Sequence, residues 1–572
     1  MSTTNIIRLG RYYTKSQFRA KFQTFKRREI QVAGSSIRHA INQFCTPELA
    51  YKAIHGYRRS DTTPSAAEKD FMRTDIPYHK IPRDEHYNRA LNVCEKLFRP
   101  SRTLHPIAYP DLRFYPWSLS VSAEYPYTFE PKWQQVIRQK QAEGEDIDGR
   151  LTFHNLYNEI FERNRVLIHK IKDGEPEFWG PDGIPIPYGI TTLHSRAHMV
   201  KAEDPDKIRA VFGVPKLLLQ AENMFIWNLQ KEYLNERVRS PMLWGFETFR
   251  GGWNKLWNRM CGGRNNTFLS ADWPGFDRKA SFQIIDDVHN MWRSWFDFTQ
   301  YEPTAAETEQ GDPKLAYPAA STNPLRIERL WKWMCHSIKH TPILGPSGQL
   351  YQWQHAGIAS GFQQTQLLDS FVNAIMILTC LSAIGINIES DEFRIMIQGD
   401  DSIMGFPEIH TSKSYFLDRF NIEANVRFGT ELSKDKTTFG NSLNDVEVLS
   451  YRNFNGISCR DPSELLAHLL YPERMRTLPA TASACVGIAL AAMGCSPQVY
   501  NVCKDVFEFL TTRLGVEPDE SWLIEYYRRR GTELIPQFKG TFPTLEETYA
   551  QNFDYSPREE SAAQRTWPTK GT

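Results

Sequence analysis

The chain has 572 residues, of which 41% are hydrophobic and 24% charged, and its 68 basic and 67 acidic side chains leave a formal net charge of +1. At roughly 150 residues per domain, this length predicts several domains or subdomains, and the composition excludes fibrous and globally disordered chains. The near-neutral charge excludes a histone-like polycation, but it is compatible with a nucleic-acid enzyme whose cations gather locally.

Cysteine usage and hydropathy predict an intracellular protein without a membrane partner. The nine cysteines are scattered and never spaced as Cys-x-x-Cys, which argues against a disulfide scaffold and a zinc site and favours a reducing compartment. The first residues contain no apolar leader, so we do not expect secretion. The most membrane-like stretch, residues 371–388, contains Asn373 and Thr379, and we expect it to be a buried core helix.

The first forty residues are strongly basic, with nine Lys and Arg side chains against Glu29 alone. This charge is typical of a solvated face, or of an arm that contacts RNA phosphates or a partner, and the sequence leaves both interpretations open. Helical patterns follow at 131–143 and 156–172, and clustered Gly and Pro predict a loop at 178–188.

Residues 194–213 form a basic segment. Arg196, Lys201, Lys207 and Arg209 recur along it, and Lys207 and Arg209, two residues apart, would lie on one side of a strand. Cations at this spacing suit a triphosphate or an RNA backbone, although an ordinary surface of ion pairs is the alternative.

Two acidic segments lie further along the chain. Residues 267–277 predict a strand that delivers Asp272 at its end, followed by a Pro-Gly turn that returns Asp277 alongside. Residues 393–406 predict a hairpin with Asp400 and Asp401 at its tip. Each pattern also has a structural interpretation, as a helix cap or as a plain turn. Together, carboxylates at strand ends are what a pair of Mg²⁺ ions needs.

Between these acidic segments, a Gly-rich loop at 356–364 opens a long apolar helix. Thr365, Asp369 and Asn373 repeat every four residues, so we expect them to share one face of that helix. A polar stripe on a buried helix needs partners, which would be either substrate or a satisfied core network.

In this order, the basic segment, Asp-x4-Asp, the Ser-Gly-x3-Thr helix and the Gly-Asp-Asp hairpin resemble the motifs of viral RNA-dependent RNA polymerases. Residues 432–437 and 446–451 are similar to the next two motifs of that family. The resemblance is closest to the polymerases of partitiviruses, which are small double-stranded RNA viruses, through 365–370 and 469–473. Picobirnavirus polymerases are the neighbouring alternative. The motifs span residues 194–475, about half of the chain.

The resemblance implies roles for individual residues. Asp272 and Asp400 would bind two Mg²⁺ ions, for which Mn²⁺ could substitute, with Asp401 supporting them. Lys436 would be the general acid, although Lys434 lies two residues away and sequence does not separate them. The substrates would be an RNA template and ribonucleoside triphosphates. The residues implied in binding them are Asp277, Ser360, Gly361, Thr365, Asp369, Asn373, Lys201, Lys207 and Arg209.

One position departs from the family pattern. Many relatives have an Asn four residues after the Thr, and it pairs with the second motif carboxylate to select ribose. Here that position is Asp369, and the nearest Asn is Asn373, one turn later. Two facing carboxylates repel unless a proton or a cation intervenes. Either residue could therefore be the partner of Asp277.

Three alternatives to polymerase activity are less consistent with the sequence. A reverse transcriptase typically has a bulky aromatic residue in place of Asp277 and a hydrophobic residue in place of Gly399. A catalytically silent RNA-binding virion protein would have no need to keep four mutually repelling acids. A metal-dependent nuclease would not explain the ordered basic segment and helix. The motif order therefore favours RNA-dependent RNA synthesis for replication and transcription of a viral RNA genome.

The resemblance implies an α+β fold, a closed right hand whose palm contains an antiparallel sheet. A capsid protein would be a partner, and the enzyme would work inside the virion or in the host cytoplasm. Residues 462–470, 480–493 and 496–514 read as thumb helices, the last capped by Ser496 with Pro497 in its first turn. The expected divisions are 1–99, a basic region that bridges fingers and thumb; 100–265, fingers; 266–282, palm; 283–355, a fingers insertion; 356–454, palm; 455–540, thumb; and 541–572, a poorly ordered tail.

Overall fold

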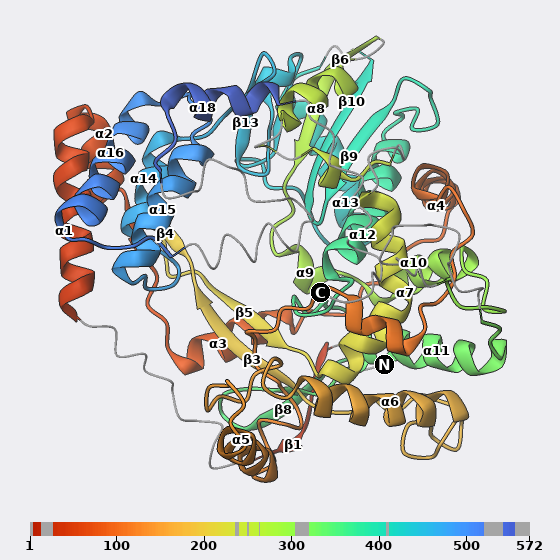
Figure 1. Ribbon diagram of the computed structural model, residues 1–572. Helices are drawn as coiled ribbons and strands as arrows, with labels where there is room; N and C mark the ends of the chain where they lie inside the picture. Colours follow the sequence, from red (N-terminus) through yellow and green to blue (C-terminus); the bar gives the residue numbers. More distant parts are fainter. Residues whose placement is uncertain are drawn as a thin grey trace, which may run out of the picture.

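The computed structural model describes residues 4–12, 27–234, 240–246, 248, 251–261, 264–303, 320–407, 411–519 and 541–554. Three groups of elements surround the centre of the molecule in Figure 1: a helical group on the left, a sheet at the upper right and a second sheet below. The fold is mixed α and β, as the sequence predicts.

The upper sheet has four antiparallel strands in the order β11-β6-β10-β9. The apolar strand β6 is buried along nearly its whole length, because it pairs on both sides. β9 and β10 form the predicted hairpin, in which Asp401 pairs with Gln398. The four strands are β6 (Asn265–Ala271), β9 (Arg394–Gln398), β10 (Asp401–Pro407) and β11 (Thr438–Gly440).

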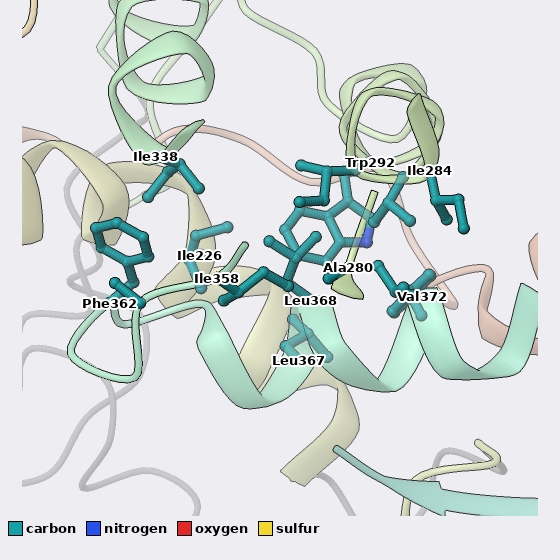
Figure 2. Close-up of a cluster of buried hydrophobic side chains, with 14 of the residues drawn as sticks. Ile226, Ala280, Ile284, Trp292, Ile338, Ile358, Phe362, Leu367, Leu368 and Val372 are labelled. Atoms are coloured by element: carbon teal, nitrogen blue, oxygen red, sulfur yellow. The ribbon is translucent and has the colours of Figure 1, made fainter. Parts of the chain in front are cut away.

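Helix α12 (Thr365–Ala383) is the core helix that the sequence predicts. Figure 2 shows its Leu367, Leu368 and Val372 packed among side chains from other helices, including Trp292. By length and composition α12 could cross a membrane, but 89% of its apolar window is buried inside the protein. It packs against α4 (Glu85–Phe98), α10 (Phe282–Ser294) and α13 (Lys413–Phe428).

The lower sheet has five strands in the order β1-β8-β7-β3-β5, and its first strand comes from the N-terminal region. β3 and β5 carry the basic segment, and the short strand β4 pairs with β2 to form a two-stranded ribbon beside them. The strands are β1 (Ile6–Arg11), β2 (Tyr57–Arg59), β3 (Thr191–Ala197), β4 (Met199–Lys201), β5 (Ile208–Gly213), β7 (Ile343–Leu344) and β8 (Gln349–Trp353).

The helical group has a hydrophobic core of its own, built from both ends of the chain. The N-terminal helices α1 (Arg27–Phe44) and α2 (Pro47–His55) pack against α14 (Pro462–Leu470), α15 (Leu478–Ala491) and α16 (Pro497–Glu508). Ser496 caps α16 as predicted, accepting a hydrogen bond from the Val499 amide at 3.3 Å. The N-terminal region therefore contributes β1 to one group and α1 to another. Residues 13–26, which hold much of the basic run, lie outside the described residues.

Helices α5 (Lys132–Ala142) and α6 (Tyr157–Asp173) confirm the helices predicted at 131–143 and 156–172. The loop predicted at 178–188 is also confirmed, since it contains only an isolated bridge. The other helices and strands are α3 (Pro64–Phe71), α7 (Lys216–Leu234), α8 (Gly252–Met260), α9 (Phe276–Lys279), α11 (Pro324–His340), β12 (Glu447–Val448), β13 (Tyr451–Phe454), β14 (Ile457–Cys459) and α18 (Leu545–Ala550).

The C-terminal residues 541–554 are not the poorly ordered tail that the low aliphatic content predicts. The Thr544 hydroxyl and the Glu547 side chain cap helix α18 reciprocally. This capping box satisfies two backbone donors at the helix start and is readable in the sequence as Thr-x-x-Glu. Asn552 is then buried and donates to the Met493 carbonyl at 3.0 Å. Residues 555–572 lie outside the described residues.

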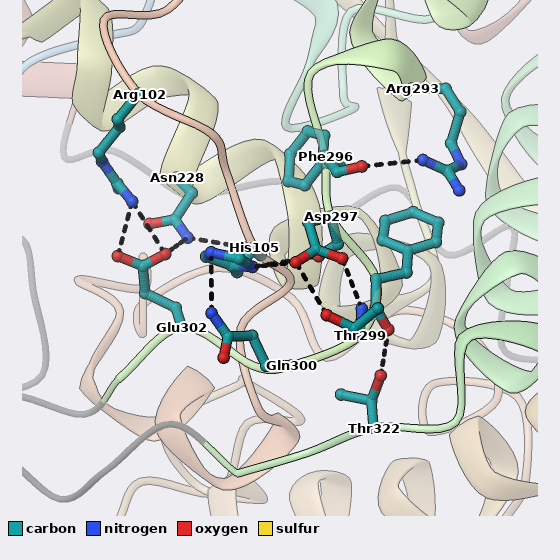
Figure 3. Close-up of polar contacts among 11 residues, drawn as sticks. Arg102, His105, Asn228, Arg293, Phe296, Asp297, Thr299, Gln300, Glu302 and Thr322 are labelled. Carbon is teal, nitrogen blue, oxygen red and sulfur yellow. Dashed lines mark hydrogen bonds and ion pairs between the residues drawn. The ribbon is translucent and has the colours of Figure 1, made fainter.

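Residues 296–324 lie within the predicted insertion 283–355, and the sequence assigns them no function. Their first part is anchored by the polar network drawn in Figure 3. Glu302 bonds Arg102 at 2.9 Å and accepts from Asn228 at 3.0 Å, and Gln300 contacts His105 at 3.2 Å. These contacts tie residues 300–302 to α7 and to the segment that holds Arg102 and His105, and Thr322 bonds the carbonyls of Phe298 and, through its amide, Thr299. Residues 304–319 lie outside the described residues.

Candidate active site

Asp272 and Asp277 lie where the sequence predicts them, at the end of β6 and just after the turn that follows it. The Asp272 backbone is held on both sides: its carbonyl accepts from the Ser433 amide at 2.9 Å, and its amide donates to the Thr437 hydroxyl at 3.2 Å. Gly275 adopts a positive φ of 63°, which permits the sharp turn into α9. The Asp277 carbonyl accepts from the Ile358 amide at 3.0 Å, so this turn also contacts the loop before α12.

The tip of the β9–β10 hairpin is fixed by two side chains of α12. The Ser370 hydroxyl accepts from the Gly399 amide at 2.8 Å. The Asn373 amide donates to the carbonyls of Gly399 and Asp400 at 3.0 and 2.9 Å, and its oxygen accepts from the Trp273 indole at 2.8 Å. Asn373 therefore joins the two acid-bearing segments through their surroundings. The polar stripe on α12 that the sequence predicts is real, and part of it positions the hairpin.

Asp272, Asp400 and Asp401 form a cluster of like charges. Burial, and then the charges of Asp400 and Asp272, raise the pKa of Asp401 to about 7. Burial also raises the pKa of Asp400, and Asp272 adds to that rise. Asp400 is nonetheless exposed to solvent, so its carboxylate lies in a part of the site that is surrounded by protein but can be reached from solution.

Such a cluster fits divalent metal ions, because hard cations take oxygen ligands and would offset the mutual repulsion. Among the described residues, no three Asp, Glu, His or Cys side chains converge into a ready metal cage. A site for Mg²⁺ can remain open in this way, because Mg²⁺ commonly completes its shell with water and substrate phosphates.

Asp369 faces Asp277. The two side chains share a hydrogen bond, and burial together with the charges of Asp277 and Asp400 holds the pKa of Asp369 well above its usual range. Burial, and then the charge of Asp400, raises the pKa of Asp277 to about 6. The pair therefore keeps a proton between its carboxyl groups. Of the two candidates that the sequence leaves open, Asp369 contacts Asp277 and Asn373 contacts the hairpin.

The loop before α12 packs directly onto the basic strand β5. A Cβ atom at Gly361 would lie 2.1 Å from the Phe212 carbonyl oxygen, so only glycine allows this approach. The Thr365 hydroxyl closes the loop by donating to the Ala359 carbonyl at 2.7 Å, while Ser360 is exposed. The three predicted loop residues thus form one structural unit next to the basic segment.

Glu222 of α7 is a residue of this unit that the sequence does not reveal. It is fully buried, and its carboxyl oxygens accept from the amides of Gln363 and Gln364 at 3.3 Å and from the Gln364 side chain at 3.0 Å. Burial raises the pKa of Glu222 to about 8. The only sign of this role in the sequence is that Glu222 is the single charged residue in the largely apolar stretch 217–229.

We expect Glu222→Ala to lower the free energy of unfolding by about 3–5 kcal/mol, because one buried and one partly buried backbone N–H group lose their acceptor and a cavity remains. Urea unfolding of the two proteins measures the difference. Glu162→Ala, on the exposed face of α6, is the matched control and should stay within about 0.5 kcal/mol of the parent. An equal effect of both substitutions would contradict this role.

The same carboxyl group predicts a pH dependence of stability. Its folded pKa of about 8 lies above the unfolded value of roughly 4.3, so the folded state holds a proton that the unfolded state releases. The stabilisation is complete below the unfolded pKa and is lost as the pH rises toward 8. The stability gap between the parent and Glu222→Ala should therefore narrow from pH 5.5 to pH 8, as measured by unfolding at both values.

The cations gather beside the acids. Lys207 and Arg209 are both exposed around the buried Ile208, so they lie on one side of the chain as predicted. Burial lowers the pKa of Lys207, as do the charges of Arg209 and Lys436, whereas Asp272 opposes the shift. Arg278, which sequence reasoning missed, bonds Asp70 at 3.2 Å and lies close enough to Asp277 and Arg209 for its pKa to respond to both. Its position directly after Asp277 is the feature of the sequence that could have identified it.

The two candidate general acids are separated in space. Lys434 forms an exposed ion pair with Asp418 at 2.7 Å. The charge of Lys436 acts on Lys207 beside Asp272. Lys201 lies on β4 opposite Tyr57, and its place in the site stays a prediction.

Comparisons with known proteins agree with this geometry. Residues 190–473 match the family model described as viral RNA-dependent RNA polymerase. The chain is 30% identical over 557 residues to the RNA-directed RNA polymerase of White clover cryptic virus 1, covering 90% of this chain and 88% of that protein. It is 26% identical over 445 residues to the RNA-directed RNA polymerase of Atkinsonella hypoxylon virus, covering 72% of this chain and 65% of that protein.

The fold is similar to a solved structure, Sicinivirus 3Dpol RNA dependent RNA polymerase, with a TM-score of 0.56 and 14% identity over 84% of this chain and 94% of that one. At this identity, the likeness shows the fold. The order of the motifs, the carboxylates gathered at the strand ends and the sequence relatives lead to one conclusion: the chain belongs to the viral RNA-dependent RNA polymerases and is a relative of the partitivirus enzymes.

Proposed function

We propose that this polymerase extends RNA by two-metal nucleotidyl transfer, with Asp272 and Asp400 holding two Mg²⁺ ions and Asp401 supporting them. The observation that carries the proposal is the cluster of these three acids, whose charges act on one another at the ends of paired strands. When bound, the ions would lower the pKa of the primer 3′-hydroxyl and neutralise charge on the departing pyrophosphate. Mn²⁺ is expected to substitute.

The protein's own groups orient the nucleotide. Arg209 in β5 and Lys207 just before it would hold the triphosphate, because the charges of both act on the acids. Lys201 would contribute less to triphosphate binding. Asp277, with Asp369 behind it, would receive the ribose 2′-hydroxyl. The unit formed by Ser360, Gly361 and Thr365 would position template and incoming nucleotide, and Asn373 would hold the hairpin in register.

The direct test uses purified full-length protein, a single-stranded RNA template and four ribonucleotides, and it compares reactions that contain Mg²⁺ or Mn²⁺ with reactions that contain a chelator. We expect template-dependent incorporation into double-stranded product with Mg²⁺ or Mn²⁺, and none with the chelator until metal is restored. Incorporation that continues at full rate without divalent metal would overturn the two-metal assignment.

We expect Lys436→Ala to lower the turnover rate about 100-fold with little change in nucleotide KM, because a general acid acts in the transition state and not in ground-state binding. Single-nucleotide incorporation under saturating substrate measures the effect. Lys434→Ala is the matched control, since its exposed ion pair contributes little, and it should stay within about threefold of the parent. A larger loss in Lys434→Ala than in Lys436→Ala would reverse the assignment.

We also propose that the sequence divisions correspond to a closed right hand. The four-stranded sheet with α12 would be the palm, the five-stranded sheet and its helices the fingers, and α14–α16 the thumb. The contacts of the N-terminal region support closure: β1 pairs with β8, while α1 and α2 pack on the helical group. Glu473 adds a link between these parts, contacting Arg196 and bonding His198 at 3.0 Å. Cations inside such a hand would let a nearly neutral protein hold RNA.

The resemblance to partitivirus polymerases is the basis for two further proposals. A capsid protein would be a partner, and the enzyme would act in the virion interior or the host cytoplasm. Particles isolated from infected cells test both. We expect intact particles supplied with ribonucleotides to make RNA that is protected from added nuclease. Synthesis confined to the particle-free fraction would contradict a virion location.

A further inference from the structure

Two thiols from separate elements meet on the surface of the helical group. Cys459 ends β14, and Cys495 lies in the connection between α15 and α16, 36 positions away along the chain. Their Sγ atoms are 3.2 Å apart, and the Cys495 thiol also contacts the Ser458 carbonyl at 3.2 Å. Cys495 is exposed and Cys459 is partly exposed, so both are open to reagents in solution.

These two cysteines differ chemically from the other seven. The neighbouring Cys495 thiol lowers the pKa of Cys459 to about 7, and the pKa of Cys495 is raised in turn. Burial raises the pKa of every other cysteine in the chain. Those seven are Cys45, Cys94, Cys261, Cys335, Cys380, Cys485 and Cys503. Since the thiolate is the reactive form, the 3.2 Å contact between the two sulfurs, which favours a thiolate within the pair, makes these two cysteines more reactive near neutral pH than the other seven.

We propose that Cys459 and Cys495 are a dithiol modification site, which a low-molecular-weight disulfide such as oxidised glutathione converts into an intramolecular disulfide. The Cys459 thiolate attacks one sulfur of the reagent, forms a mixed disulfide and expels one thiolate. The Cys495 sulfur then attacks the Cys459 sulfur and expels the second thiolate. Two electrons pass from the protein to the reagent, and the two protein thiol protons end on the two released thiols.

The surrounding contacts already hold the two elements in place for this bond. The Tyr451 hydroxyl donates to the Ala491 carbonyl at 2.9 Å, which joins β13 to the end of α15. Asn552 makes a second bridge, between β14 and the residues that follow α15, since it accepts from the Ser458 amide at 3.0 Å and donates to the Met493 carbonyl at 3.0 Å. The disulfide would therefore close a covalent loop containing α14 and α15 within the folded arrangement, and we expect it to raise the midpoint of thermal unfolding.

The test exposes the full-length protein to oxidised glutathione at pH 7.5, measures the intact mass, and then blocks the remaining thiols by alkylation and identifies the cross-linked peptides. We expect a product lighter by two hydrogens, a Cys459–Cys495 peptide pair, a higher unfolding midpoint and full reversal by dithiothreitol. Cys261→Ser is the matched control and should behave as the parent.

The single variants test the order of the steps. Cys495→Ser should accumulate a stable glutathione adduct on Cys459, because no second thiol resolves it. Cys459→Ser should react at least about tenfold more slowly at neutral pH, as expected for a thiol of higher pKa. Stable glutathione adducts on the parent without the internal bond, or links through any other cysteine, would overturn the proposal. The acids of the active site play no part in these readouts.

Discussion

Asp400→Asn is expected to lower the rate of RNA synthesis at least about 1,000-fold, a loss of roughly 4 kcal/mol of transition-state stabilisation. The substitution removes one negative charge from the acid cluster while keeping the size of the side chain. The hairpin should survive it, because Asn373 binds the backbone carbonyls of Gly399 and Asp400 and not the Asp400 side chain. Incorporation of labelled ribonucleotide on a defined template measures the loss.

Asp391→Asn supplies the matched control for this experiment. Asp391 is exposed just before β9, on the same hairpin as Asp400, so its loss changes the net charge equally without touching the cluster. It should retain activity within about twofold, as for other surface changes away from special features. Near-parental synthesis by Asp400→Asn, with an unchanged unfolding midpoint, would remove Asp400 from the metal site.

Asp369→Ala is expected to reduce the preference for ribonucleotides over deoxynucleotides by about 10- to 100-fold. The buried Asp369 carboxyl supports Asp277 through their shared hydrogen bond, and a hydrogen bond to a charged group contributes roughly 1.5–3 kcal/mol. Asp369 is buried, so its effect on ribose selection would act through Asp277. The ratio of kcat/KM for matched ribo- and deoxynucleotides measures the effect.

Two further variants separate ribose selection from general damage. Asp369→Asn keeps a side chain that can bond Asp277 without a shared proton, and its preference should stay within about threefold of the parent. Asn373→Ala removes the bonds that hold the hairpin tip and should lower incorporation of both sugars alike. A loss of ribose preference in Asn373→Ala, with none in Asp369→Ala, would exchange the two assignments.

Local patterns in the sequence were sufficient for many elements. The apolar runs on either side of Gly399 predict the β9–β10 hairpin, and Ser496 followed by Pro497 predicts the start of α16, because turn and cap preferences act within a few residues. The same reasoning failed at the C-terminus, where low aliphatic content outweighed the capping box of Thr544 and Glu547. Composition averages over a segment, whereas a cap depends on two side chains at a fixed spacing.

The sequence by itself determined the class of enzyme, the order of its acidic and basic segments and the periodicity that places Thr365, Asp369 and Asn373 on one face of α12. Only the tertiary structure decided which of these residues meets Asp277, which lysine has a charge that acts on Lys207, and that Glu222 supports the loop before α12. The physical reason is distance along the chain. Helix and strand periods set the direction of a side chain within its own element, but a shared proton, a shifted pKa or a buried acceptor depends on a partner that only folding brings close.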